Sequence, residues 1–295
     1  MNDTHLSSQI PGISFAVGAA VAFGTLAIFA KYAYREGADP VALLSVRFAA
    51  AACIVAVFRA LQRGRRKSSR DQVIRLILLG GLGYAFEASL FFAALQNAPA
   101  AVVSLVFYSY PLWTALLGFA IGLERFRPQF LVALVLGSVG VVVIFSAPIG
   151  GLKGPLLALA AAVAVAVYFI AVQVFTKGVD ASSSALWTSA GAAASTAVIA
   201  PLAGQSIPLS ALPPAFALGL ASAVAFLLLF AAIARIGSPR SAVAAMMEPV
   251  TTVVLAAVFL NEVITGRVIA GTVLVVAALP VLALTGPAPP EPSLG

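Results

Sequence analysis

Ten long hydrophobic runs, separated by short polar or turn-rich segments, organise almost the whole chain. A helix needs about 20 mainly apolar residues to cross a bilayer, and each run has roughly that length. The intervening segments, such as REGADP and QRGRRKSSRDQ, combine charge with the turn formers Gly and Pro. The pattern predicts ten transmembrane helices, at 12–34, 39–61, 73–95, 99–121, 127–146, 154–176, 184–203, 214–236, 240–260 and 266–285.

Composition supports an all-α integral membrane protein. The 295 residues are 62% hydrophobic and 9% charged, whereas a soluble domain has roughly a quarter charged residues. Cys53 is the single cysteine and His5 the single histidine, which argues against an intrachain disulfide, a metal cluster or histidine-based catalysis. We therefore expect no enzymatic activity, no metal and no cofactor.

The distribution of Lys and Arg predicts the orientation, because cytoplasmic loops are enriched in both. With both termini inside, twelve of the 17 basic residues fall on the inner side, four fall outside, and Arg47 lies within a span. The net charge of +7 could also indicate nucleic acid binding, but a cytoplasmic loop explains the RGRRK run fully. We expect a multi-pass membrane protein with a cytoplasmic N-terminus and C-terminus.

An internal repeat relates the two halves of the chain. A shift of 138 positions places Pro111 on Pro249, Thr114 on Thr252, and Glu124 on Glu262. Each half has five spans, and because five is odd, the second half must enter the membrane inverted relative to the first. Inverted repeats around a site at the membrane midplane are a recurring transporter design.

The repeat suggests the domain organisation. We expect an N-terminal tail at 1–11, a first five-helix repeat at 12–146, a second, inverted one at 154–285, and a disordered C-terminal tail at 286–295.

The paired signatures Pro111…Leu123-Glu124 and Glu248-Pro249…Asn261-Glu262 resemble those of a known group. With ten spans and a five-plus-five repeat, the chain is similar to the EamA-type branch of the drug/metabolite transporter superfamily. Within that branch it looks closest to bacterial exporters of aromatic and other amino acids. The resemblance implies a bundle with a central cavity, a location in the bacterial inner membrane, and efflux from the cytoplasm. The first half departs from the second in having Tyr110 where the second has Glu248.

The two matching prolines mark predicted flex points. Proline has no N–H to bond the carbonyl four residues back. Pro111 therefore leaves the Phe107 carbonyl without its helical donor, and Pro249 does the same to the Ala245 carbonyl. A free carbonyl should face protein or water at that depth. We expect both helices to line the cavity, and the costly charge of Glu248 to lie there or against a neighbouring helix end.

Arg47 and Glu87 are predicted to form a buried ion pair. Each lies eight residues from the outer end of its span, or about 12 Å deep at 1.5 Å per residue. The pair could merely fix packing, or it could sense substrate. Glu124 and Glu262 end their spans, and we expect both to be interfacial.

Mid-span aromatic residues complete the candidate site, because the polar tips of tyrosine and tryptophan need partners and aromatic faces attract ammonium groups. The alternative for each is ordinary core packing. The candidate cavity residues are Tyr84, Glu87, Tyr108, Tyr110, Trp113, Tyr168, Phe169, Gln173 and Glu248.

These features favour a secondary transporter that exports amino acids or related small metabolites by alternating access. No phosphate-binding motif of the Walker A type is present, so ATP is not expected to drive it. The alternatives are efflux of organic cations or drugs, and then a nucleotide-sugar or other metabolite carrier. An intramembrane enzyme or a channel is disfavoured. The expected partners are a small-molecule substrate and the lipid bilayer, with no nucleic acid, and the chain could be a monomer or a homodimer.

Overall fold

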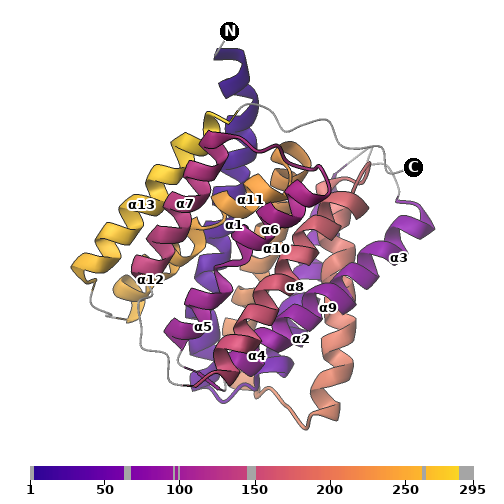
Figure 1. Ribbon diagram of the computed structural model, residues 1–295. Helices are drawn as coiled ribbons and strands as arrows, with labels where there is room; N and C mark the ends of the chain where they lie inside the picture. Colours follow the sequence, from indigo (N-terminus) through magenta and orange to yellow (C-terminus); the bar gives the residue numbers. More distant parts are fainter. Residues whose placement is uncertain are drawn as a thin grey trace.

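A computed structural model shows a bundle of α-helices with no strand in the part described (Figure 1). The described residues are 3–62, 68–95, 97–98, 100–144, 151–260 and 264–285. The Glu262 prediction, the RGRRK run at 63–67 and the predicted tail at 286–295 lie outside them. The helices are α1 (Asp3–Arg35), α2 (Pro40–Leu61), α3 (Arg70–Leu78), α4 (Ala85–Leu95), α5 (Ala100–Phe107), α6 (Tyr110–Ala120), α7 (Pro128–Ile144), α8 (Lys153–Phe175), α9 (Ala181–Leu202), α10 (Leu212–Ile236), α11 (Ser238–Ala244), α12 (Met247–Leu260) and α13 (Gly266–Ala283).

Every predicted span coincides with one helical segment. In the part described, nine segments are long and apolar enough to cross a membrane, and the tenth, α7, has 17 residues. Three spans are interrupted rather than continuous. A π-helical turn, η1 (Leu79–Tyr84), joins α3 to α4, and short turns separate α5 from α6 and α11 from α12. The short η2 (Leu209–Ala211) precedes α10.

The expected N-terminal tail at 1–11 needs a correction, because α1 is helical from Asp3 onward. A hydropathy window finds the apolar part of a helix, and a polar extension can continue the same backbone hydrogen bonding outside the bilayer. Pro11 lies inside α1, so the boundary chosen at this proline is not a helix boundary.

The helix contacts follow the repeat. α1 packs along α10 and against α11 and α12 in the same way that α8 packs along α4 and η1 and against α5 and α6. α2 also packs on α10 in the way that α9 packs on α3 and η1, and the contacts of α2 with α9 and of α7 with α13 each join equivalent helices of the two halves. Exchange of the halves thus leaves the main contacts unchanged, as an inverted repeat requires.

Small residues allow the closest of these contacts. A Cβ atom on Gly140 of α7 would lie 2.7 Å from the carbonyl oxygen of Gly271 on α13. A Cβ atom on Gly80 would overlap the backbone carbonyl of Thr188 on α9. Helices in lipid gain packing energy where small residues let their backbones approach, so these glycines make the close helix contacts possible.

The two ends of the bundle are named here from the predicted orientation. The inner end holds the start of α1, the end of α8 and the start of α11, and it lies at the top of Figure 1 with the N-terminus. The outer end holds the end of α1 and the starts of α2, α5 and α8. α5 and α11, the two short half-helices, lie toward opposite ends (Figure 1).

Candidate functional site

A cavity of about 430 Å³ lies between the two halves. This volume is within the usual range of small-molecule sites, which is roughly 300–1,000 Å³. Its walls come from α1, α2, η1, α4, α5, α6, α8, α10 and α12 and from the turns that interrupt the fourth and ninth spans. Seven candidate residues named from the sequence line it, namely Tyr84, Glu87, Tyr108, Tyr110, Tyr168, Phe169 and Glu248.

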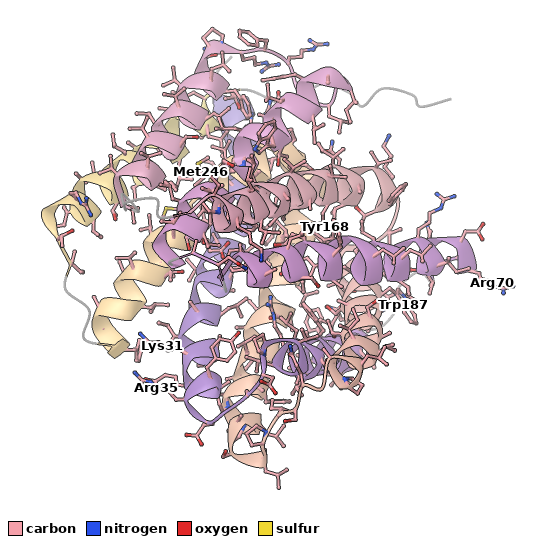
Figure 2. All side chains as sticks on the ribbon, turned by 60° about the horizontal axis from the view of Figure 1, so that its bottom comes forward. Lys31, Arg35, Arg70, Tyr168, Trp187 and Met246 are labelled. Atoms are coloured by element: carbon pink, nitrogen blue, oxygen red, sulfur yellow. The ribbon has the colours of Figure 1, made fainter. Side chains whose placement is uncertain are left out.

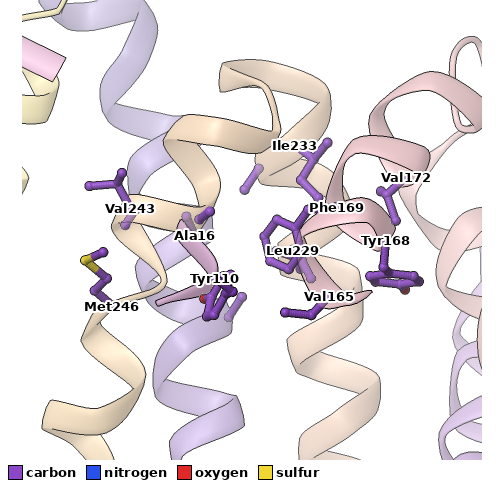
Figure 3. Close-up of a cluster of buried hydrophobic side chains, with 14 of the residues drawn as sticks. Ala16, Tyr110, Val165, Tyr168, Phe169, Val172, Leu229, Ile233, Val243 and Met246 are labelled. Atoms are coloured by element: carbon purple, nitrogen blue, oxygen red, sulfur yellow. The ribbon is translucent and has the colours of Figure 1, made fainter. Parts of the chain in front are cut away.

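The cavity reaches the outer end of the bundle and is closed toward the inner end. Lys31 and Tyr34 line it near the end of α1, where both side chains are exposed, and Figure 2 shows Lys31 in that position. Its innermost lining residues include Phe169, Leu229 and Ala245. Beyond them, the buried side chains of Ile233 and Val243 belong to the hydrophobic core (Figure 3).

The π-helical turn η1 positions two of the polar groups. Its sequence LGGLGY contains three glycines, and the N–H of Ala85 donates to the carbonyl five residues back, on Gly80. π-turns inside α-helices are frequent at functional sites. The wider turn ends at Tyr84 and is followed by Glu87, so it resets the direction of both side chains relative to α3.

The fourth and ninth spans supply the other polar groups close to the turns that interrupt them. Tyr108 lies in the turn between α5 and α6, and Glu248 is the second residue of α12. The Tyr108 hydroxyl donates a hydrogen bond to the Glu248 carboxylate. The prediction that the Ala245 carbonyl is free is wrong, because this carbonyl accepts a hydrogen bond from the Glu248 N–H at 2.9 Å. The tighter turn recovers the partner that Pro249 cannot supply.

Arg47 does not form the predicted salt bridge with Glu87. No ion pair within 4.0 Å joins them in the described part of the chain. Arg47 Nε donates to Ser222 Oγ at 2.7 Å, and Arg47 Nη2 donates to the Tyr84 hydroxyl at 3.2 Å. The guanidinium also lies 4.9 Å from the ring centroid of Phe48. Equal depth on neighbouring helices permits a pair but does not fix the rotation of either helix, and here Ser222 on α10 takes the arginine.

Glu87 lines the same cavity with only 5% of its surface exposed. Among the described residues, no donor lies within hydrogen-bonding distance of its carboxylate. It remains close enough to Arg47 and Glu248 to interact electrostatically with both. A carboxylate held in an apolar site without a direct partner is costly unless a cation or water satisfies it.

Aromatic rings surround these charges. Tyr84 packs edge to face with Tyr168, at 5.4 Å between ring centroids, and Tyr110 packs on Phe169 at 5.5 Å. Phe107 and Phe91 extend the cluster toward the outer end. The cavity therefore combines two carboxylates and one anchored guanidinium with an aromatic wall.

Two candidates from the sequence lie outside the cavity. Trp113 is half-buried and packs against the hydrophobic core. Gln173 is buried, and its Oε1 accepts from the Ser238 N–H at 2.7 Å. Trp113 is three residues beyond Tyr110 and Gln173 four beyond Phe169, about one helical turn toward the inner end. Both are therefore on the closed side of the cavity floor, which periodicity within one helix could not locate.

The predicted interfacial position of Glu124 is also wrong. Its side chain is 1% exposed and forms an ion pair with Arg240 of α11. The pairing joins residues 116 positions apart in different halves, and no local spacing indicates it.

The fold and its cavity define a membrane transporter built from two inverted five-helix repeats. The model of the EamA-like transporter family matches residues 10–146 and 152–284, and the chain belongs to this family. Its members transport small metabolites.

One solved structure, described as "Crystal structure of protein", shares the fold. Its TM-score is 0.80 and its identity 24%, over 92% of this chain and 98% of that one. No curated protein matches the chain.

Proposed function

We propose that the protein exports amino acids, aromatic ones included, or related small metabolites across the bacterial inner membrane by alternating access. The observation that carries the proposal is the Glu87 carboxylate, buried at the cavity without a hydrogen-bond donor among the described residues. An ammonium group would supply both the charge and the donors that this carboxylate lacks.

Arg47 provides the complementary half of a zwitterion site. Ser222 and Tyr84 engage its Nε and Nη2, and its Nη1 group has no hydrogen-bond partner in the described part of the chain. A guanidinium recognises carboxylates through its fixed array of donors. A substrate carboxylate at Arg47 and an ammonium at Glu87 would together use both charges.

The aromatic wall favours substrates with an apolar or aromatic side chain. Ring pairs such as Tyr84–Tyr168 and Tyr110–Phe169 leave large apolar surface facing the cavity. Aromatic side chains stack on such rings, and ring faces also attract ammonium groups. A nucleotide-sugar carrier would need more basic residues than the two, Lys31 and Arg47, that line this cavity among the described residues.

Efflux of organic cations is the second candidate, supported by the two carboxylates beside tyrosine rings. It differs from the first because an organic cation has no carboxylate for Arg47 to bind. Purified protein in liposomes, given labelled phenylalanine and leucine beside phenethylamine and a quaternary amine, separates the two. Amino acid export predicts counterflow of phenylalanine that is lost in Glu87→Gln and in Arg47→Gln.

The control is Glu36→Gln, in an exposed turn after α1, which should transport normally. Counterflow of both amines, with no counterflow of either amino acid and no effect of Arg47→Gln, would replace the first candidate by the second. No counterflow of any of these compounds would remove both.

A further inference from the structure

A buried ion pair closes the inner end of the bundle. Arg240 Nε lies 2.6 Å from Glu124 Oε2 and donates to it, and Arg240 Nη2 donates to Glu124 Oε1 at 2.9 Å. Each side chain is 1% exposed. Arg240 Nη1 also donates to Gln9 Oε1 at 3.3 Å. The pair thus ties the turn after α6 in the first half to α11 in the second half, with α1 alongside.

α11 is the segment that blocks the inner end. All seven of its residues, Ser238 to Ala244, are buried. The Ser238 hydroxyl donates to the carbonyl of Phe169, and Pro239 packs on Gly118, where a Cβ atom would lie 2.6 Å from Pro239 Cγ. α11 contacts α1, α6, α7, α8, α10 and α13. Ala245, directly after α11, lines the cavity, so this helix lies just beyond the cavity floor.

The equivalent segment of the first half is α5, and its packing is looser. The shift of 138 positions places Ser238 on Ala100 and Arg240 on Val102. α5 packs mainly on α4 and α8, and its residues Ser104 and Phe107 line the open cavity. Two halves of one fold therefore hold the same half-helix in two arrangements, tight at the inner end and open at the outer end.

In an inverted-repeat transporter, the two halves exchange these arrangements when the opposite side opens. α11 would then leave its tight packing, and α5 would adopt it. Val102 carries no charge, so the outer end has no counterpart of Arg240. The structure thus closes its inner end with a charge pair that the sequence does not provide at the outer end.

We propose that Arg240 and Glu124 form an inner gate that holds the protein open to the outside and must separate in every transport cycle. This inference rests on the proposed function only for alternating access, and it does not depend on which substrate is carried. Removal of the pair should shift the population toward the state that is open to the inside, because only the state that is open to the outside contains the Arg240–Glu124 interaction.

The test uses two reporter cysteines in a Cys53→Ala background. Ser241→Cys is on buried α11 at the inner end, and Ser104→Cys is on α5 at the cavity wall. Each is combined with Glu124→Gln, which keeps the side-chain shape and removes the charge. We expect modification of the inner reporter by a small cationic thiol reagent, in inside-out vesicles, to become roughly tenfold faster. Modification of the outer reporter in right-side-out vesicles should become slower.

Opposite changes at the two reporters distinguish a gate from a packing contact, since loosened packing would not protect Ser104→Cys. The matched control is the Arg59–Asp180 ion pair, also at the inner end, with N–O distance 2.8 Å. Asp180→Asn should leave both reporter rates unchanged. Because no substrate is added, a failed substrate panel leaves this test intact.

A second variant covers the case in which Glu124→Gln does not fold. Glu124→Leu with Arg240→Met replaces the buried pair by apolar side chains, an exchange that other proteins often tolerate. The same opposite changes are expected. Unchanged rates at both reporters, or equal gains at both in protein that elutes as a single species, would overturn the proposal.

Discussion

Thr114 and Thr252, 138 positions apart, make the same hydrogen bond in the two halves. The Thr114 hydroxyl donates to the Tyr110 carbonyl at 2.8 Å, and the Thr252 hydroxyl donates to the Glu248 carbonyl at 3.1 Å. Each threonine lies one turn after a break in its span, and such back-bonding often bends a helix. Pro111 and Pro249 lie between the break and the threonine, where a missing N–H is tolerated.

The two prolines should therefore matter for the rate of transport more than for binding. In Pro111→Ala and Pro249→Ala, the restored N–H can bond the carbonyl four residues back and continue the helix through the break. We expect slower initial transport in proteoliposomes with substrate affinity changed by less than about threefold, since uniform binding is retained. Pro128→Ala, at the exposed start of α7, is the control. Full transport rate in both variants would remove the breaks from the cycle.

Ser222 should set the affinity for substrate carboxylate through Arg47. Ser222→Ala removes the 2.7 Å bond that anchors Arg47 Nε, and a hydrogen bond to a charged group contributes about 1.5–3 kcal/mol. We expect KM for an amino acid to rise roughly tenfold, while KM for the matching amine stays the same. Ser45→Ala, on α2 like Arg47, loses only a bond to the carbonyl of Val41 and should change neither value. Equal effects on acid and amine would contradict this role.

Gly80 should be required for folding. Its missing Cβ leaves room for the Thr188 carbonyl, which belongs to backbone and cannot rotate away. Gly80→Leu should lower stability by more than the roughly 1–3 kcal/mol usual for overpacking, seen as loss of monodisperse protein in detergent. Gly266→Leu, at a position where no atom lies within 4 Å of an added Cβ, is the matched control and should behave as wild type. A normal melting temperature for Gly80→Leu would show that η1 and α9 can separate without cost.

Asp180 should stabilise the inner end of α9 in a pH-dependent manner. Partial burial alone would raise its pKa, but hydrogen bonds from Ser182, Arg59 and Ser183 outweigh burial and hold the pKa of this carboxyl well below its usual value. A carboxyl with a lowered folded-state pKa stabilises the fold above its unfolded pKa, about 3.9, and the contribution disappears as pH falls below that value. Asp180 also caps α9 by accepting from the Ser183 N–H at 2.9 Å.

Asp180→Ala should therefore cost about 0.5–2 kcal/mol at pH 7, the usual range for a lost helix cap. The difference from wild type should stay constant from pH 8 to about pH 5 and shrink below about pH 4. Thermal melts in detergent across this range measure it, with Glu36→Ala as an exposed control. A difference that shrinks already between pH 8 and pH 6 would contradict the lowered pKa.

The orientation makes a further prediction about labelling in intact cells. In a Cys53→Ala background, Glu36→Cys in the exposed turn after α1 should react with a membrane-impermeant thiol reagent. Asp71→Cys, exposed at the start of α3, should react only after the membrane is opened. The opposite labelling pattern would show that the orientation in the membrane is reversed, and the Arg240–Glu124 pair would then close the outer end.

Much of the architecture follows from sequence alone, because membrane insertion depends on the mean hydropathy of about 20 residues, which is a local property. The ten spans were predicted in this way, the internal repeat predicted the two halves, and the paired Pro and Glu signatures indicated the family. The prolines also marked the fourth and ninth spans as interrupted, since a missing N–H acts on the same helix. Seven cavity residues were predicted from their polar or aromatic character at mid-span. At that depth a polar side chain exposed to lipid is costly, so it is expected to face the protein interior.

Tertiary structure decided what depends on helix rotation and on which end is closed. Ser222 rather than Glu87 binds Arg47, and Arg240 rather than water binds Glu124, because these choices join residues more than 100 positions apart. Polar or aromatic character at mid-span predicts a cavity position for Trp113 and Gln173 as much as for Tyr110 and Phe169. The structure nevertheless places Trp113 and Gln173 one turn beyond the cavity floor. Hydropathy is nearly the same in an inward-open and an outward-open bundle. Only the packing of α11 against the other half closes one end and thereby fixes which side chains face the cavity.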